Sequence, residues 1–60
     1  MTARNKILSE ILIKIGGNPP SDLSRNNILE AIVIALGGTV TDPSNRNELL
    51  QDCLNAINGG

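Results

Sequence analysis

The stretch Arg25-Asn26-Asn27-Ile28-Leu29-Glu30-Ala31-Ile32-Val33-Ile34-Ala35-Leu36-Gly37-Gly38 decides the fold of this 60-residue chain. It has close counterparts 21 residues earlier, at 4–17, and 21 residues later, at 46–59. An Arg-Asn pair, five apolar positions and a glycine recur at the same offsets in all three. Such self-similarity is the signature of an architecture built from equivalent units. We therefore interpret 1–60 as a single domain of three units, at about 4–24, 25–45 and 46–60.

The apolar positions of each unit follow the spacing i, i+1, i+4, i+5 and i+8. At roughly 100° per residue they form one stripe about 140° wide, which is typical of an amphipathic helix and not of a strand. The stripe comprises Ile7, Leu8, Ile11, Leu12 and Ile15, then Ile28, Leu29, Ile32, Val33 and Leu36, then Leu49, Leu50, Cys53, Leu54 and Ile57. The sequence therefore predicts an all-α domain, with helices at about 4–15, 25–36 and 46–57 whose stripes make one core.

Residues that start and stop helices lie where this interpretation needs them. Gly16-Gly17, Gly37-Gly38 and Asn58-Gly59 follow the last stripe residue of each unit, where a left-handed residue closes a helix at least cost. Ser24 and Asn45 are expected N-caps, and Glu48 completes a capping-box spacing with Asn45. The linkers 17–23 and 38–44 are too long and proline-rich for tight hairpins, so we expect helix–extended loop–helix connections.

Ile13 and Ile34 occupy the same repeat position and point nearly opposite the centre of the stripe. With its two extra alanines, the second helix is apolar almost all round, which is typical of a helix buried on all sides. One explanation is that it is simply the central helix, and another is that Ile13 and Ile34 belong to a surface that another chain covers; the two can hold together. The third unit carries Asn55 at this position and Asp52 where the second has Ala31, so we interpret it as an outward terminal unit.

A polar seam is expected at the start of each helix, formed by Arg4, Arg25, Arg46, Asn5, Asn26 and Asn47. Positive charge in the first turn opposes the helix dipole, so the recurring arginines need a compensating contact. The partners expected for them are loop acids such as Asp22 and Asp42, backbone carbonyls of the neighbouring unit, or another chain. The amides share the seam because they both donate and accept hydrogen bonds.

Composition excludes most chemical functions. The chain has no His, Trp, Tyr or Phe, so we expect no catalytic site, no metal and no cofactor or other small-molecule ligand. The six acids are scattered, which predicts a solvated surface, and the single Cys53 is expected to be a buried, inert hydrophobe. A net charge of −1 gives no basic footprint for nucleic acid or anionic lipid. Neither a signal peptide nor a membrane span is expected.

Small size favours a partner. For a chain of 60 residues with no aromatic side chain, disulfide or metal, the expected free energy of folding is close to zero. Self-association as a homo-oligomer and docking on a larger assembly both supply the missing burial. We expect the surface involved to include Ile13, Ile34 and the Arg-Asn seam.

The phrases 25–38 and Ser44-Asn45-Arg46-Asn47-Glu48-Leu49-Leu50-Gln51-Asp52-Cys53-Leu54-Asn55-Ala56-Ile57 resemble the short Arg-Asn-x-Leu-Leu…Leu-Gly-Gly repeats of virion structural proteins of tailed bacteriophages. The resemblance covers all three units. It implies a noncatalytic, multi-copy cementing, decoration or adaptor protein on the capsid, neck or tail. Its partners would be other virion proteins or itself, and it would be made in the host bacterial cytoplasm. The resemblance transfers no functional residue, because its pattern is a packing pattern.

A second interpretation comes from another class of protein. A helix, a proline-containing extended loop and a second helix also resemble the helix–extended loop–helix modules of the SAP and LEM kind. The loop Asn18-Pro19-Pro20-Ser21-Asp22 has no basic residue for DNA, so this alternative is a protein-interaction module outside a virion.

Overall fold

The computed structural model describes residues 3–59. Within them the chain forms three helices, α1 (Ala3–Lys14), α2 (Arg25–Ala35) and α3 (Arg46–Ile57), and no strand. The all-α prediction is confirmed, and each helix end lies within one residue of its predicted place. None of these helices has the length and apolar character needed to cross a membrane.

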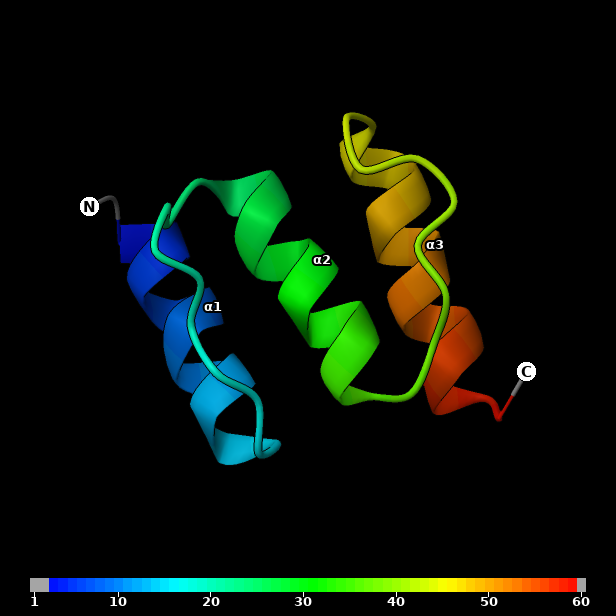
Figure 1. Ribbon diagram of the computed structural model, residues 1–60, viewed down its shortest axis with the longest axis horizontal. Coiled ribbons are helices and arrows are strands. Elements are labelled where there is room, and N and C mark those ends of the chain that lie inside the picture. Colours follow the sequence, from blue (N-terminus) through cyan, green and yellow to red (C-terminus); the bar gives the residue numbers. More distant parts are fainter. Residues whose placement is uncertain (1–2, 60) are drawn as a thin grey trace.

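The three helices lie side by side in one row (Figure 1). Each runs in the same direction, and each extended loop climbs back to the level at which the next helix begins. α2 packs against both neighbours, whereas α1 and α3 do not contact each other within the described residues. α2 is therefore central, but the expectation that it is buried all round is wrong, because the side chain of Ile34 is 62% exposed. A row leaves both broad sides of its middle helix open to loops and solvent.

Paired glycines end α1 and α2 in the same way. Gly16 and Gly37 have φ values of +92° and +83°, which L side chains rarely adopt. The N–H of Gly16 donates to the carbonyl of Ile13, and that of Gly17 donates to Leu12, at 3.0 and 2.9 Å. These two bonds satisfy carbonyls that the end of a helix leaves free. The glycine pairs therefore stop the helices as predicted.

The second glycine of each pair also sets how closely the helices approach. A Cβ added at Gly38 would lie 2.7 Å from the Cβ of Ala56, and one at Gly17 would lie 3.0 Å from that of Ala35. Ala35 and Ala56 occupy one repeat position. The same glycine–alanine contact therefore joins α1 to α2 and α2 to α3.

The predicted helix starts are partly correct. The side-chain oxygen of Asn45 accepts from the N–H of Glu48 at 3.2 Å, so this N-cap is confirmed. The Glu48 carboxylate does not complete the capping box, since it accepts from the hydroxyl of Thr41 at 3.4 Å. Ser24 holds the N-cap position of α2 without a side-chain capping bond.

The core is smaller than the stripes predict. Its buried apolar residues are Leu12, Ile28, Leu29, Ile32, Val33 and Leu49. Six other stripe residues, expected in the core, are between 38% and 66% exposed, namely Ile7, Ile11, Ile15, Leu50, Leu54 and Ile57. Because the helices form a row, every stripe has two flanks. Among the described residues, no helix packs on the outer flank of α1 or of α3. Five of these exposed residues belong to α1 or α3, and Ile15 directly follows the end of α1.

Candidate assembly surface

The Arg-Asn pairs form a ladder between neighbouring repeats. The Nε of Arg25 donates to the Oδ1 of Asn5 at 3.4 Å, and the amide of Asn5 donates to the carbonyl of Leu23 at 3.1 Å. The next step repeats this contact, since the Nε of Arg46 donates to the Oδ1 of Asn26 at 3.3 Å. Each amide thus accepts from the arginine of the following unit while donating to the backbone before that arginine. We call each such pair a rung.

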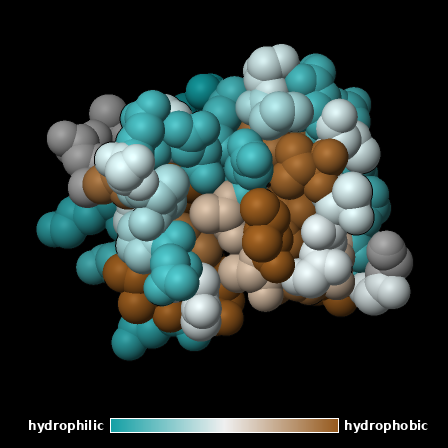
Figure 2. All heavy atoms as spheres, in the orientation of Figure 1, coloured by the Kyte–Doolittle hydropathy of each residue, from teal (hydrophilic) through white to brown (hydrophobic). Residues whose placement is uncertain are grey.

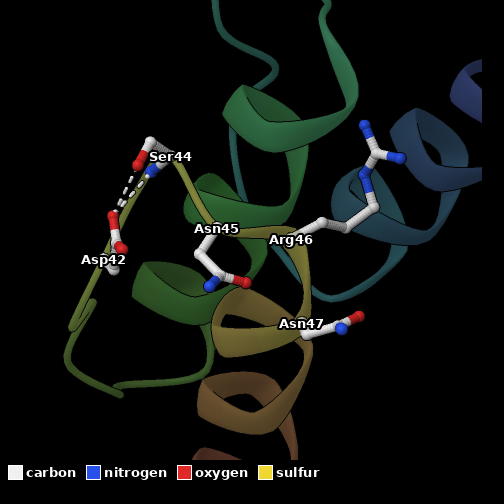
Figure 3. Close-up of a pocket in the computed structure, with 5 residues that line it drawn as sticks. All are labelled: Asp42, Ser44, Asn45, Arg46 and Asn47. Atoms are coloured by element: carbon white, nitrogen blue, oxygen red, sulfur yellow. Dashed lines mark hydrogen bonds between the residues drawn. The ribbon is translucent and has the colours of Figure 1, made fainter.

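The acids expected to compensate the arginines have another role. Asp22 accepts from the N–H of Ser24 at 3.2 Å, and Asp42 accepts from the N–H and hydroxyl of Ser44 at 3.0 and 2.7 Å (Figure 3). These hydrogen bonds lower the pKa of Asp42 from its ordinary value of 3.8. The expectation that these loop acids pair with the arginines is therefore wrong, because each carboxylate is used to fix the turn before its own helix.

The ladder has two open ends. Asn47 occupies the repeat position of Asn5 and Asn26, yet it makes no side-chain hydrogen bond within residues 3–59. Figure 3 shows its amide extending away from the loop residues drawn beside it. Arg4, at the other end, also has no hydrogen-bond partner in the described part of the chain. An unused acceptor therefore lies on α3 and an unused donor on α1.

The arginines line one edge of the row. Arg4, Arg25 and Arg46 alternate there with the three leucines of the equivalent positions, Leu8, Leu29 and Leu50, around a shallow depression. Burial, together with repulsion from the two other arginines, lowers the pKa of Arg25 below its ordinary value. Arg25 stays charged at neutral pH, so the edge carries three like charges.

The apolar stripe divides into two flanks with different neighbours. Ile28 and Leu49, which share the repeat position of Ile7, are 0% exposed because they face the preceding helix, whereas Ile7 is 57% exposed. Leu12 and Val33, which face the following helix, are also 0% exposed, whereas their counterpart Leu54 is 51% exposed. We name the open flank of α1 the front face, formed by Ile7 and Ile11, and the open flank of α3 the back face, formed by Leu50 and Leu54.

Ile13 and Ile34 lie outside both faces, with side chains 55% and 62% exposed. Ile34 borders a surface depression together with Pro20 of the preceding loop and Ala31. On the side of the molecule that carries the loops, hydrophobic atoms reach the surface over the C-terminal part of α1 and between α2 and α3 (Figure 2). The upper rim in this view, near the helix N-termini, is mainly hydrophilic. The prediction that a partner covers Ile13 and Ile34 stays a prediction.

Two buried polar side chains were not expected from the sequence. Asp52 is only 4% exposed, and its carboxylate accepts from the N–H of Thr41 at 2.9 Å and from the Thr41 hydroxyl at 3.0 Å. The prediction of a solvated Asp52 is therefore wrong. The hydroxyl of Ser9 is buried without a hydrogen-bond partner. The signal available for Asp52 was the threonine eleven residues before it, but the spacing alone does not show that the loop folds back onto α3.

Cys53 is half-buried rather than buried, in the place that Ile32 takes in α2. Burial raises the pKa of its thiol, and the carboxylate of Asp52 adds to the effect. Its Sγ lies 4.0 Å from the carbonyl oxygen of Leu29. Across residues 3–59, no group of three or more His, Cys, Asp or Glu side chains is placed to hold a metal ion.

The chain matches no protein-family model, no curated protein and no solved structure. The inference of function therefore starts from the surfaces described above.

Proposed function

We propose that this chain is a noncatalytic structural protein that works by docking onto other protein surfaces. The observation that carries the proposal is the exposure of eight large hydrophobic side chains on a chain of 60 residues. They are Ile7, Ile11, Ile13, Ile15, Ile34, Leu50, Leu54 and Ile57, each between 38% and 66% exposed. Exposed apolar surface of this extent on a small domain is typical of a protein-interaction site.

The more specific proposal is a small multi-copy cementing, decoration or adaptor protein on the capsid, neck or tail of a tailed-bacteriophage virion. It is supported by the resemblance of the Arg-Asn…Gly-Gly repeats, and by the use of those residues for packing. The arginine and asparagine form the rungs, while the glycines end the helices and allow their close approach. A repeated packing pattern with open ends suits a protein that works by assembly.

Ile13 and Ile34 are proposed to contact the coat, neck or tail protein. They share one repeat position on two parallel neighbouring helices, so a partner surface that accommodates one also meets the other. The polar Asn55 at the same position of α3 limits this contact to α1 and α2.

The test is incorporation into particles. We expect the chain to co-purify with virions from the producing culture at a fixed ratio to the coat protein, measured by quantitative mass spectrometry. The variant Ile13→Glu with Ile34→Glu should remain helical and lose incorporation. The variant Asn55→Glu is the matched control, at the same repeat position, and should be incorporated normally.

Two results would contradict the proposal. A wild-type chain that stays entirely in the particle-free fraction would exclude the virion role and favour an interaction module of another system. If the isoleucine variant unfolds as a monomer, Ile13 and Ile34 contribute to the core and are not a docking surface.

A further inference from the structure

The two ends of the helix row carry the halves of a contact that the chain already makes twice. The flank of α1 that carries Leu12 packs on the flank of α2 that carries Ile28, and both side chains are 0% exposed. α2 also packs on α3, and Val33 and Leu49, which occupy the repeat positions of Leu12 and Ile28, are likewise 0% exposed. The back face of α3 occupies the same repeat positions as the flank of α1 that carries Leu12. The front face of α1 occupies the same repeat positions as the flank of α2 that carries Ile28. Each face therefore has the other as the natural continuation of the row.

The residue types at the two open faces preserve this contact. The back face offers Leu50 and Leu54, where α1 uses two leucines. The front face offers Ile7 and Ile11, where α2 uses two isoleucines. A contact between the back face and the front face would therefore join the same kinds of side chain that α1 and α2 bury between them.

The polar ladder continues in the same direction. In each internal rung an arginine donates to the asparagine 20 residues before it. Within residues 3–59, Asn47 has the unused acceptor and Arg4 the unused donor that one more rung requires. Apolar and polar contacts thus specify the same partner surface in the same register.

We propose that a second copy of this chain docks head to tail, with the front face of its α1 on the back face of α3 and its Arg4 bonded to Asn47. The proposal rests on the proposed function of a multi-copy structural protein, and it names a second copy as one partner. Because the two faces differ, the contact is heterologous, and repeating it generates a ring or an open filament. The copies thereby continue the row of helices across chain boundaries.

At one repeat position, the proposed contact between copies has a different residue type from the contacts within the chain. α1 carries Lys14 where α2 and α3 carry the alanines that touch Gly17 and Gly38. Lys14 is exposed, and its flexible stem can turn aside when another helix approaches. Its ammonium group would then lie near the C-terminal end of the neighbouring α3, where the helix dipole favours a cation.

The test uses two variants that each block one face. The front-blocked variant is Ile7→Glu with Ile11→Glu, and the back-blocked variant is Leu50→Glu with Leu54→Glu. All four side chains are at least 45% exposed, so both variants should keep the helicity measured by circular dichroism. Both blocks carry the same charge, so the two blocked faces also repel each other.

Sedimentation velocity then distinguishes the possible arrangements. The wild-type chain should grow in mass with concentration, whereas each blocked variant should sediment alone as the 6.3 kDa monomer. An equimolar mixture should form a species of twice that mass and nothing larger, because it contains one intact front face and one intact back face. A front-blocked variant that dimerises alone would overturn the proposal in favour of back-to-back pairing. A wild-type chain that stays monomeric up to millimolar concentration would also overturn it.

The rung provides a second measurement that does not depend on the apolar substitutions. Asn47→Asp gives Arg4 of the next copy a carboxylate, so it should tighten association several-fold at low salt, with the gain lost at high salt. Adding Arg4→Gln should abolish the gain. If Asn47→Asp leaves association unchanged at every salt concentration, Arg4 does not meet Asn47.

The two proposals fail separately. The variant Ile13→Glu with Ile34→Glu leaves both end faces intact and should self-associate like the wild type while losing incorporation into particles. Head-to-tail association of the wild-type chain without incorporation into particles would contradict only the proposed virion role. Incorporation into particles of a wild-type chain that never self-associates would contradict only the proposed head-to-tail contact.

Discussion

The guanidinium of Arg46 donates through its Nε to the side-chain oxygen of Asn26 at 3.3 Å, joining the first turn of α3 to the first turn of α2. The amide of Asn26 at the same time donates to the carbonyl of Ser44 at 3.2 Å, just before α3 begins. One side chain thus holds both the helix and the loop that leads into it. The same arginine–asparagine contact joins Arg25 to Asn5, so it links each unit to the next one within the chain.

Removing this rung should cost stability. Asn26→Ala deletes an acceptor for Arg46 and a donor for the carbonyl of Ser44, with an expected loss of about 1–2 kcal/mol in the free energy of unfolding. Asn47→Ala is the matched control, because Asn47 has the same repeat position and no bond within residues 3–59. It should change the free energy of unfolding of the monomer by less than about 0.5 kcal/mol. Urea titrations followed by circular dichroism measure both, and equal losses would contradict the role of the rung.

Gly38 should be sensitive to a single methyl group. The Cβ introduced by Gly38→Ala would lie 2.7 Å from that of Ala56, so the variant must push α3 away from α2. Overpacking of this kind costs about 1–3 kcal/mol. Combining it with Ala56→Gly should recover part of the loss, although glycine in a helix itself costs about 1 kcal/mol. A double-mutant cycle measures the coupling. Strictly additive losses would show that Gly38 and Ala56 do not limit the approach.

Asp52 should stabilise the loop before α3 more than its place on a helix suggests. Asp52→Ala leaves the N–H of Thr41 without its acceptor, and an unsatisfied group of this kind costs about 1–3 kcal/mol. Asp52→Asn retains one acceptor oxygen and should lose less. The exposed neighbour Gln51 is the control, and Gln51→Ala should leave the thermal midpoint nearly unchanged. If Asp52→Ala melts like the wild type, the contact with Thr41 does not contribute.

Acid should weaken the turn held by Asp42. The pKa of Asp42 is lowered in the folded chain by its bonds to Ser44, so its contribution is complete above the ordinary value of 3.8. That contribution is lost as the pH falls through the lowered folded-state pKa. We expect the thermal midpoint of the wild type to fall more between pH 5.5 and strongly acidic pH than that of Asp42→Asn. The reason is that the asparagine side chain at position 42 does not titrate. Parallel pH profiles for the two chains would exclude this contribution.

Much of the local structure was predictable because it depends on residues close in sequence. The 21-residue repeat, the 3.6-residue periodicity and the glycine pairs determined three helices, their ends and their equivalence. The Asn45 cap was predictable for the same reason, since its partner is three residues away. The capping bond expected from Ser24 is absent, and the Glu48 carboxylate accepts from the hydroxyl of Thr41 instead of the N–H of Asn45.

The partners of the seam were not predictable to the same degree. Asp22 and Asp42 were reasonable partners by charge for the arginines, but each is closer to the serine two residues after it. An amide oxygen from the preceding repeat takes their place, at a sequence separation of 20 residues. Similarly, nothing in the order of residues showed that the loop before α3 turns back to bury Asp52 against Thr41.

The sequence by itself determined that the chain is three equivalent amphipathic helices, because helix formation and termination are governed by neighbours along the chain. Only the tertiary structure decided that these helices lie parallel in a row, so that each stripe has one flank toward the preceding helix and one toward the following helix. In a closed bundle the fifteen stripe residues would share one core. In a row the outer flanks of α1 and α3 remain open, because the chain supplies no neighbour for them within residues 3–59.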